Sequence, residues 1–160
     1  MMLYLLRHGE AEPRAANDAA RRLTVRGRQD VDSVARQFLE NKLPLQLCIS
    51  SPYVRAVQTA ERFLDQVASD LALSQDPLLT PEVRAADVMR LLETLQAEQV
   101  MLVSHNPLLS ELNALLTEGN ISLMHILDTS ELVAINIDVI GLGMGRTVLR
   151  LAPGQAPVPD

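Results

Sequence analysis

The chain has 160 residues, a formal net charge of −6 and a single cysteine. This length predicts one domain that buries about 70% of the surface exposed by its unfolded chain. The acidic balance and the scarcity of aromatic residues argue against a nucleic-acid partner, because such a chain repels a polyanion and offers few rings for base stacking. No apolar run is long enough for a signal sequence or a membrane span, so we expect a cytoplasmic protein without membrane contact.

An apolar run near the start of the chain breaks abruptly into polar residues. Residues 3–6 have the pattern of a buried strand, and Arg7, His8 and Gly9 follow directly at its end. A strand that ends on a cation and an imidazole is typical of a functional site. We interpret His8 as a nucleophile toward phosphorus.

The next segment alternates between loop, helix and strand patterns. Residues 10–22 contain proline and short polar side chains without a sustained period, which predicts a functional loop. Thr24 is a suitable N-cap for a helix that continues to about Glu40. Residues 45–49 then predict a second short buried strand, in which Cys48 is a buried structural thiol rather than a reactive one.

A second helix is predicted directly after this strand. Ser51 is a suitable N-cap with Pro52 at the first helical position, and an apolar stripe at helical spacing continues to Leu71. Arg55 then lies in the first turn, beside backbone N–H groups that favour an anion. Residues 74–81 are predicted to be a proline-containing link.

The second half of the chain repeats the opening pattern. Residues 85–97 predict a helix, and an apolar strand at residues 100–103 is followed by His105 and another helix. Residues 132–140 and 147–151 predict a final antiparallel hairpin. Strands that alternate with helices indicate an α/β fold with a mostly parallel sheet, whose ligand sites lie beyond the carboxyl ends of the strands.

These patterns bring two imidazoles and two guanidinium groups to one edge of the predicted sheet. If His8 and His105 meet there with Arg7 and Arg55, the arrangement predicts a phosphate pocket, since arginine matches phosphate oxygens and neutralises their charge without a metal. A neutral histidine nitrogen can attack phosphorus to give a phosphohistidine that water later cleaves. Cys48 and the histidines lack metal-ligand spacing, so we predict no metal and no cofactor.

The same residues resemble the signature of the histidine phosphatase superfamily, also called phosphoglycerate mutase-like. Its Arg-His-Gly corresponds to residues 7–9, and its Leu-Thr-x-x-Gly to residues 23–27. Its Ser-x-x-x-Arg-Ala-x-Gln-Thr corresponds to residues 51–59, and its late Ser-His to residues 104–105. The resemblance implies a single-domain three-layer α/β/α fold with a phosphatase domain over residues 1–151. The three prolines in residues 152–160 predict a frayed tail.

In length the chain is most similar to the SixA-type protein phosphohistidine phosphatases. That resemblance implies that His8 is the nucleophile and that Arg7, Arg55 and His105 bind the phosphoryl group. It also implies that Gly9 and Arg21 contribute to substrate binding. The expected activity is hydrolysis of phosphohistidine in phosphorelay or phosphotransfer proteins.

The chain departs from the family pattern at the proton donor. Larger members place a Glu in an insertion or an Asp directly after the late histidine, whereas Asn106 follows His105 here. Glu82 and Asp87 lie in the remaining segment, and Glu82 is the candidate donor. A protonated imidazole leaves more readily than an alkoxide, so a missing acid suits phosphohistidine and disfavours alkyl phosphates.

Two other functions compete with this interpretation. One is a phosphatase for a small phosphometabolite, and the other is a phosphoprotein-binding module without turnover. The carboxylates of Glu10, Glu12 and Asp18 are interpreted as solvated loop charge, with discrimination among partners as the alternative. His125 has no motif around it and is assigned a structural or surface role.

Overall fold

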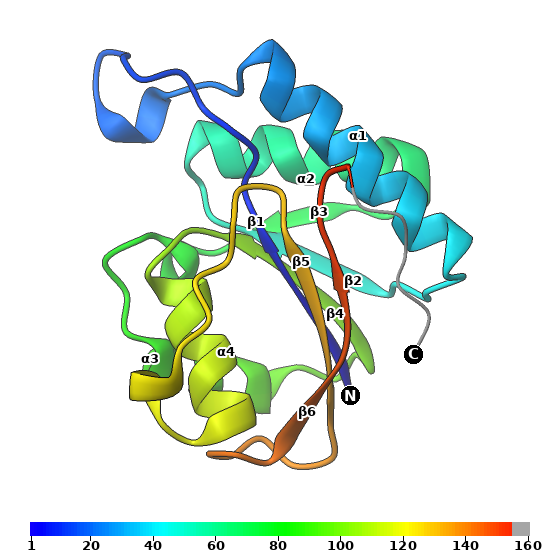
Figure 1. Cartoon of the computed structure of the whole chain (residues 1–160), viewed down its shortest axis with the longest axis vertical. Coiled ribbons are helices and arrows are strands. Elements are labelled where there is room, and N and C mark those ends of the chain that lie inside the picture. The colour runs from blue at the N-terminus through cyan, green and yellow to red at the C-terminus, as the bar shows by residue number, and fades with distance from the viewer. Residues whose placement is uncertain (155–160) are drawn as a thin grey trace.

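In the computed structural model, which describes residues 1–154, six strands form one sheet with helices on both faces (Figure 1). The strand order is β3-β2-β4-β1-β5-β6, and the pairs among β1 to β4 are parallel. The strands are β1 (Met2–Arg7), β2 (Leu47–Ser50), β3 (Leu73–Gln75), β4 (Gln99–Ser104), β5 (Leu132–Ile137) and β6 (Gly145–Leu151). The helices are α1 (Val25–Glu40), α2 (Val54–Val67), α3 (Ala85–Thr94) and α4 (Leu108–Glu118), with three short 3-10 turns. The predicted α/β fold is confirmed.

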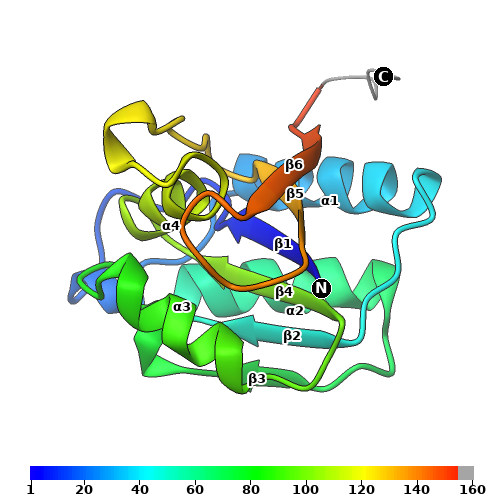
Figure 2. The same cartoon turned by 90° about the horizontal axis from the view of Figure 1, so that it is seen from below.

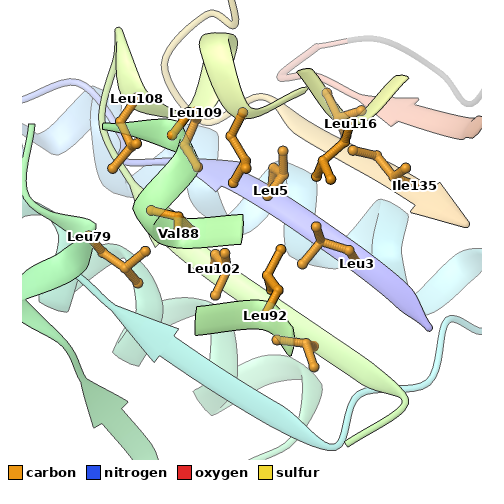
Figure 3. Close-up of a cluster of buried hydrophobic side chains, with 14 of the residues drawn as sticks. Leu3, Leu5, Leu79, Val88, Leu92, Leu102, Leu108, Leu109, Leu116 and Ile135 are labelled. Atoms are coloured by element: carbon orange, nitrogen blue, oxygen red, sulfur yellow. The ribbon is translucent and has the colours of Figure 1, made fainter. Parts of the chain in front are cut away.

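The helices form two layers with the sheet between them. Helices α1 and α2 cover one face, and α3 and α4 cover the other (Figures 1 and 2). Each layer has its own buried apolar cluster; Figure 3 shows the one beneath α3 and α4. Within residues 1–154, none of the helices combines the length and hydropathy that a membrane-spanning segment requires.

Strand β1 lies inside the sheet and is buried on both faces. Leu3 and Leu5 point into the cluster under α3 and α4, whereas Tyr4 and Leu6 point into the cluster under α1 and α2. This explains why the opening run is continuously apolar instead of alternating with polar residues. The strand is therefore fixed in position up to its last residue, Arg7.

The few aromatic side chains are concentrated beneath α1 and α2. The ring of Phe38 packs edge-on against Tyr4 and Phe63, with ring centroids 5.0 and 5.2 Å away. Such pairs contribute about 0.5–1.5 kcal/mol beyond the area they bury. They join α1, α2 and β1 in an otherwise aliphatic core.

Several predicted boundaries need correction. Helix α1 begins after the predicted N-cap Thr24, but α2 begins at Val54 instead of Pro52 and ends before Leu71. The hydroxyl of Ser51 accepts a hydrogen bond from Tyr53 N, outside the helix. Strand β3 replaces the first part of the predicted link, because a three-residue edge strand is too short to give a period in the sequence.

The end of the chain agrees with the hairpin prediction. Strands β5 and β6 pair antiparallel at the edge of the sheet. In the segment predicted to fray, the carbonyl of Ala152 accepts a hydrogen bond from Gln37 Nε2. The rest of that prediction, for residues 155–160, lies outside the described residues.

The register of β1 and β4 brings the two histidine-containing strand ends together. Arg7 pairs with Ser104 across the parallel ladder, so the next residue on each strand, His8 and His105, leaves the same edge of the sheet. Strand β2 ends beside them, where Ser50 pairs with Val103. The sheet therefore presents both imidazoles and the start of α2 at one edge.

Gly27 holds the beginning of α1 against the loop that follows β1. A Cβ atom at this position would lie 2.9 Å from the backbone N of Glu10 and closer still to its carbonyl oxygen. The Oγ1 of Thr24 caps the helix by accepting from Gly27 N at 2.9 Å. The glycine of the Leu-Thr-x-x-Gly motif is thus required by close backbone contact.

We expect Gly27→Ala to lower the free energy of unfolding by about 1–3 kcal/mol, because the added methyl meets backbone that cannot move away cheaply. Urea denaturation of the purified protein measures this change. Gly141→Ala is the matched control, since its nearest obstacle is the flexible and exposed side chain of Met144 at 3.0 Å. An equal loss of unfolding free energy in the two variants would contradict the requirement for glycine at position 27.

Candidate active site

A cavity of about 410 Å³ opens at this edge of the sheet. Its lining residues come from the ends of β1 and β4, the loop after β1, the start of α2 and two further loops. They are Arg7, His8, Glu10, Ala11, Asp18, Arg21, Arg55, Pro81, His105, Asn106 and Thr129. A larger surface hollow of about 530 Å³, at the end of α2, contains no histidine or arginine and offers no comparable chemistry.

His8 is held in one orientation and one tautomer. Its Nδ1 lies 2.8 Å from the carbonyl oxygen of Gly9, which can only accept, so Nδ1 carries the ring proton and donates a hydrogen bond to this oxygen. The Nε2 atom is therefore unprotonated, and it accepts a hydrogen bond from Arg55 Nε at 3.2 Å. The lone pair needed for nucleophilic attack is on the Nε2 atom of a buried ring.

Burial keeps this imidazole neutral. The pKa of His8 is lowered from 6.5 to about 4, first by loss of solvation and then by the nearby charges of Arg55, Arg7 and Arg21. The hydrogen bond with Gly9 opposes this shift. At neutral pH, His8 is consequently present as the unprotonated base.

Arg55 is fixed by two segments distant in sequence. It is only 4% exposed, and its Nη1 and Nη2 donate to the backbone oxygen and Oδ2 of Asp18 at 2.7 and 3.1 Å. Asp18 also accepts from Arg21 Nη1 at 3.0 Å. The hydrogen bond from Arg21, followed by the hydrogen bond and charge of Arg55, holds the pKa of Asp18 below its usual value, although burial acts in the opposite direction.

This contact corrects the interpretation of Asp18 as solvated loop charge. Its carboxylate ties the loop after β1 to Arg55, whose Nε faces His8. Glu10 Oε1 is also engaged, since it accepts from Thr24 Oγ1 at 2.8 Å. Two of the three loop carboxylates therefore organise the cavity wall.

Arg7 supplies a second guanidinium from the end of β1. Its Nη1 donates to the carbonyl of Leu127 at 2.7 Å. Its Nε is buried and has no acceptor among residues 1–154. A buried donor without a partner carries a desolvation cost, which a bound oxyanion would remove.

His105 interacts with the hydroxyl group of Ser51. The ring Nε2 lies 2.8 Å from Ser51 Oγ, which already accepts from Tyr53 N. The hydroxyl proton is therefore best satisfied by donation to an unprotonated Nε2, which places the ring proton on Nδ1. That Nδ1 is a buried donor with no acceptor in the described part of the chain.

His105 is neutral for the same reasons as His8. Loss of solvation is the main cause that lowers its pKa to about 3, followed by the proximity of His8 and Arg55. The two imidazole rings are tilted, with centroids 5.0 Å apart. Both rings therefore enter the cavity uncharged, and the positive charge there comes from arginine.

The motif at residues 51–59 connects α2 to three other parts of the site. Arg55 reaches His8, Gln58 Oε1 accepts from Leu23 N at 2.9 Å, and Thr59 Oγ1 accepts from Gly9 N at 3.0 Å. The contacts of Ser51, Gln58 and Thr59 were missed in the sequence analysis. Their signals were membership of the motif at residues 51–59 and one-turn spacing with Arg55, neither of which names a partner.

The remaining candidates occupy different positions. Arg21 lines the cavity, whereas the N–H of Gly9 is used by Thr59. Glu82 accepts a hydrogen bond from Tyr53 OH at 3.3 Å, and its neighbour Pro81 lines the cavity in its place.

Asp87, which the sequence analysis named beside Glu82, and Asn106, which lines the cavity, are already paired. Asp87 pairs with Arg84 and Arg90. The amide of Asn106 donates to Leu127 O and accepts from Ser110 Oγ. Neither side chain is therefore poised to donate a proton.

Within residues 1–154, no group of three or more acidic, histidine or cysteine side chains is arranged to hold a metal.

Two histidines and two arginines at one edge of a parallel sheet form a site that suits a phosphoryl group. The family model described as the histidine phosphatase superfamily (branch 1) matches residues 3–80. Together with a relative of 31% identity that is covered over 89% of both chains, this match shows that the chain belongs to the histidine phosphatase superfamily.

Within this superfamily, the chain is similar to proteins named SixA. The relative of 31% identity, over 146 residues, is the phosphohistidine phosphatase SixA of Escherichia coli K12. A SixA homolog of Haemophilus influenzae is 36% identical over 127 residues, which cover 71% of this chain and 76% of that protein. A structure of SixA complexed with tungstate has a TM-score of 0.87 and 28% identity, covering 96% of this chain and 97% of the other.

The two buried neutral histidines should make stability depend on pH. Each has a folded-state pKa below its unfolded value of 6.5, so the unfolded chain binds more protons as the pH falls. The free energy of unfolding should therefore decrease between pH 6.5 and about pH 4. The slope is about 1.4 kcal/mol per pH unit for each histidine that stays neutral.

Chemical denaturation at several pH values, with wild type and His8→Gln, measures this slope. We expect the substitution to reduce it, because one of the two neutral histidines is removed. A free energy of unfolding that is constant across this window would refute the burial argument.

Proposed function

We propose that the chain is a phosphohistidine phosphatase in which His8 forms a covalent phosphohistidine intermediate. The observation that carries this proposal is the state of His8, whose Nδ1 is engaged by Gly9 and whose unprotonated Nε2 lies in an arginine-lined cavity. The similarity to proteins named phosphohistidine phosphatase, over most of their length, supports the same reaction. The substrate is a histidine-phosphorylated protein.

The first step transfers the phosphoryl group to the enzyme. The Nε2 atom of His8 attacks phosphorus, a P–N bond to His8 forms, and the P–N bond to the substrate imidazole breaks. The leaving imidazole takes one proton and departs neutral. Arg55 Nε, which contacts Nε2 before the reaction, then lies beside the transferring group and can donate to one of its oxygens.

The second step returns the enzyme to its starting state. Water attacks the phosphorus of phospho-His8, the P–N bond breaks, and inorganic phosphate leaves with the added oxygen. The buried Nε of Arg7 and the guanidinium of Arg55 offset the charge of the phosphoryl oxygens in both steps. The tungstate complex of SixA supports an oxyanion site in this fold, because tungstate is also a tetrahedral oxyanion.

We assign His105 the role of a neutral hydrogen-bond donor to the phosphoryl group. The hydroxyl of Ser51 occupies Nε2, which leaves the Nδ1–H to find an acceptor in a bound oxyanion. Ser51 is then a positioning residue that sets the tautomer of His105. A neutral donor of this kind can hydrogen-bond a phosphoryl oxygen without adding a further charge to the site.

The proton for the leaving imidazole is proposed to come from solvent. Glu82, the candidate from the sequence, is engaged by Tyr53 OH and does not line the cavity as described. Phosphohistidine can be protonated before its P–N bond breaks, so a fixed acid is not required. This favours phosphohistidine over an alkyl phosphate, whose alkoxide needs a donor as it leaves.

Trapping of the intermediate tests the nucleophile. Wild-type protein, incubated with phosphohistidine protein and quenched rapidly in alkali, should carry acid-labile phosphate on His8. His8→Ala should carry none and lose roughly 10³-fold or more in turnover, because the group that forms the covalent bond is missing.

The matched control is His125→Ala, which removes an exposed imidazole outside the cavity and should retain both phosphate trapping and turnover. Equal trapping on wild type and His8→Ala would overturn the nucleophile assignment. Hydrolysis of a sugar phosphate but not of phosphohistidine protein or free phosphohistidine would overturn the proposed substrate.

Replacing Ser51 tests the role of His105. We expect Ser51→Ala to reduce kcat about tenfold, corresponding to about 1–1.5 kcal/mol for one lost hydrogen bond that orients a charge-stabilising donor. Nitrogen-15 NMR of His105 should report protonated Nδ1 in wild type and a shifted tautomer equilibrium in the variant. An unchanged tautomer in Ser51→Ala would show that another group fixes the ring.

A further inference from the structure

The segment that borders the cavity has the opposite charge balance to the rest of the chain. Residues 10–28 contain five arginines and three carboxylates, a net charge of +2, in a chain whose formal net charge is −6. The other residues therefore carry a net charge of −8. The positive charge is concentrated beside the cavity, where the loop after β1 leads into α1.

Three of these arginines are exposed and form what is called here the arginine rim: Arg14, Arg22 and Arg26. Within residues 1–154, Arg14 and Arg22 have no carboxylate within 4.0 Å, and Arg26 has only Asp30 at 3.8 Å. The side chain of Arg26 is 77% exposed. These cations are thus available to a partner.

Backbone contacts hold the rim against the cavity wall. The carbonyl of Arg22 accepts from Glu12 N at 2.7 Å, and the adjoining Leu23 forms a bridge with Ala11, which lines the cavity. Glu10, a second lining residue, is bonded to Thr24. Arg22 directly precedes and Arg26 follows this connection in the chain, so the rim adjoins the segment that lines the cavity.

Interaction with the helix dipole does not account for this charge. A helix is stabilised by acidic residues in its first turn, but α1 has none there and carries Arg26 and Arg28 in their place. Val25, between them and Arg22, is 69% exposed. The exposed Arg84 and Arg90 of α3 pair with Asp87 at 3.0 and 2.9 Å, closer than the 3.8 Å between Arg26 and Asp30.

We propose that the arginine rim is a docking surface for an acidic protein face that surrounds the substrate phosphohistidine, with Val25 as an apolar contact within it. This inference rests on the proposed function and names the chemistry of the partner. Long-range attraction between the rim and acidic side chains would raise the rate of encounter, and it would favour partners whose phosphohistidine is flanked by carboxylates. A nucleic acid is disfavoured by the net charge of −8 elsewhere.

Charge reversal separates docking from chemistry. The double variant Arg22→Glu/Arg26→Glu changes two rim residues, neither of which lines the cavity. Two probes are compared at low salt: free phosphohistidine, and a histidine-containing phosphotransfer protein that is phosphorylated in vitro and carries acidic residues around its histidine. We expect kcat/KM for the protein to fall about tenfold or more, mainly through KM, with kcat/KM for free phosphohistidine within about twofold of wild type.

Two controls make the result specific. Arg36→Glu/Arg90→Glu introduces the same change in net charge at exposed positions outside the cavity lining and should behave as wild type with both probes. A version of the protein substrate whose acidic residues near the histidine are replaced by lysine should be hydrolysed better by Arg22→Glu/Arg26→Glu than by wild type. Raising the salt concentration should reduce the difference between wild type and the rim variant.

The proposal is overturned if kcat/KM for the acidic protein falls equally in the rim variant and the control variant, or if the rim variant retains the wild-type value. It is also overturned if the rim variant loses kcat/KM equally for both probes, since the arginines would then act on the chemistry inside the cavity. Failure of wild type to hydrolyse either probe would instead reject the proposed function.

Discussion

The parallel pairing of β1 with β4 is the constraint on which the rest of the site depends. It sets Arg7 beside Ser104, and therefore releases His8 and His105 at the same edge of the sheet. Burial of β1 on both faces fixes this register, because a shift by one residue would turn the side chains of Leu3 and Leu5 to the opposite layer. The catalytic geometry is thus a consequence of core packing.

Burial affects the histidines and the arginine at this edge of the sheet differently. Loss of solvation keeps both imidazoles neutral, while hydrogen bonds to Asp18 and His8 replace the water around the buried guanidinium of Arg55. The loop after β1 is therefore part of the site in an energetic sense. Its carboxylate compensates the guanidinium that the phosphoryl group would meet.

The sequence was sufficient for the features that depend on local pattern. Strands ending on His8 and His105, a helix starting near Arg55, and an α/β sheet all follow from apolar periodicity and from the order of elements. The cap at Thr24 was predictable as well, because its hydroxyl bonds a residue three positions away.

Contacts between distant segments could not be predicted in the same way. Ser51 satisfied the usual rule for a helix start, but its hydroxyl is used by His105, and α2 begins three residues later. The sequence around Asp18 is typical of a solvated loop, and only the fold shows that its carboxylate contacts Arg55. Glu82 was chosen by its position in the chain, whereas only the folded structure shows its contact with Tyr53.

The hydrogen bond between Arg55 and His8 has a consequence for the enzyme at rest. Before an oxyanion arrives, the lone pair of His8 Nε2 already accepts the Nε–H of Arg55, 3.2 Å away. In the proposed mechanism, an incoming phosphoryl group competes for this guanidinium, whereas a proton or an uncharged electrophile does not. Exposure of the proposed nucleophile would thereby be coupled to recognition of the phosphoryl group.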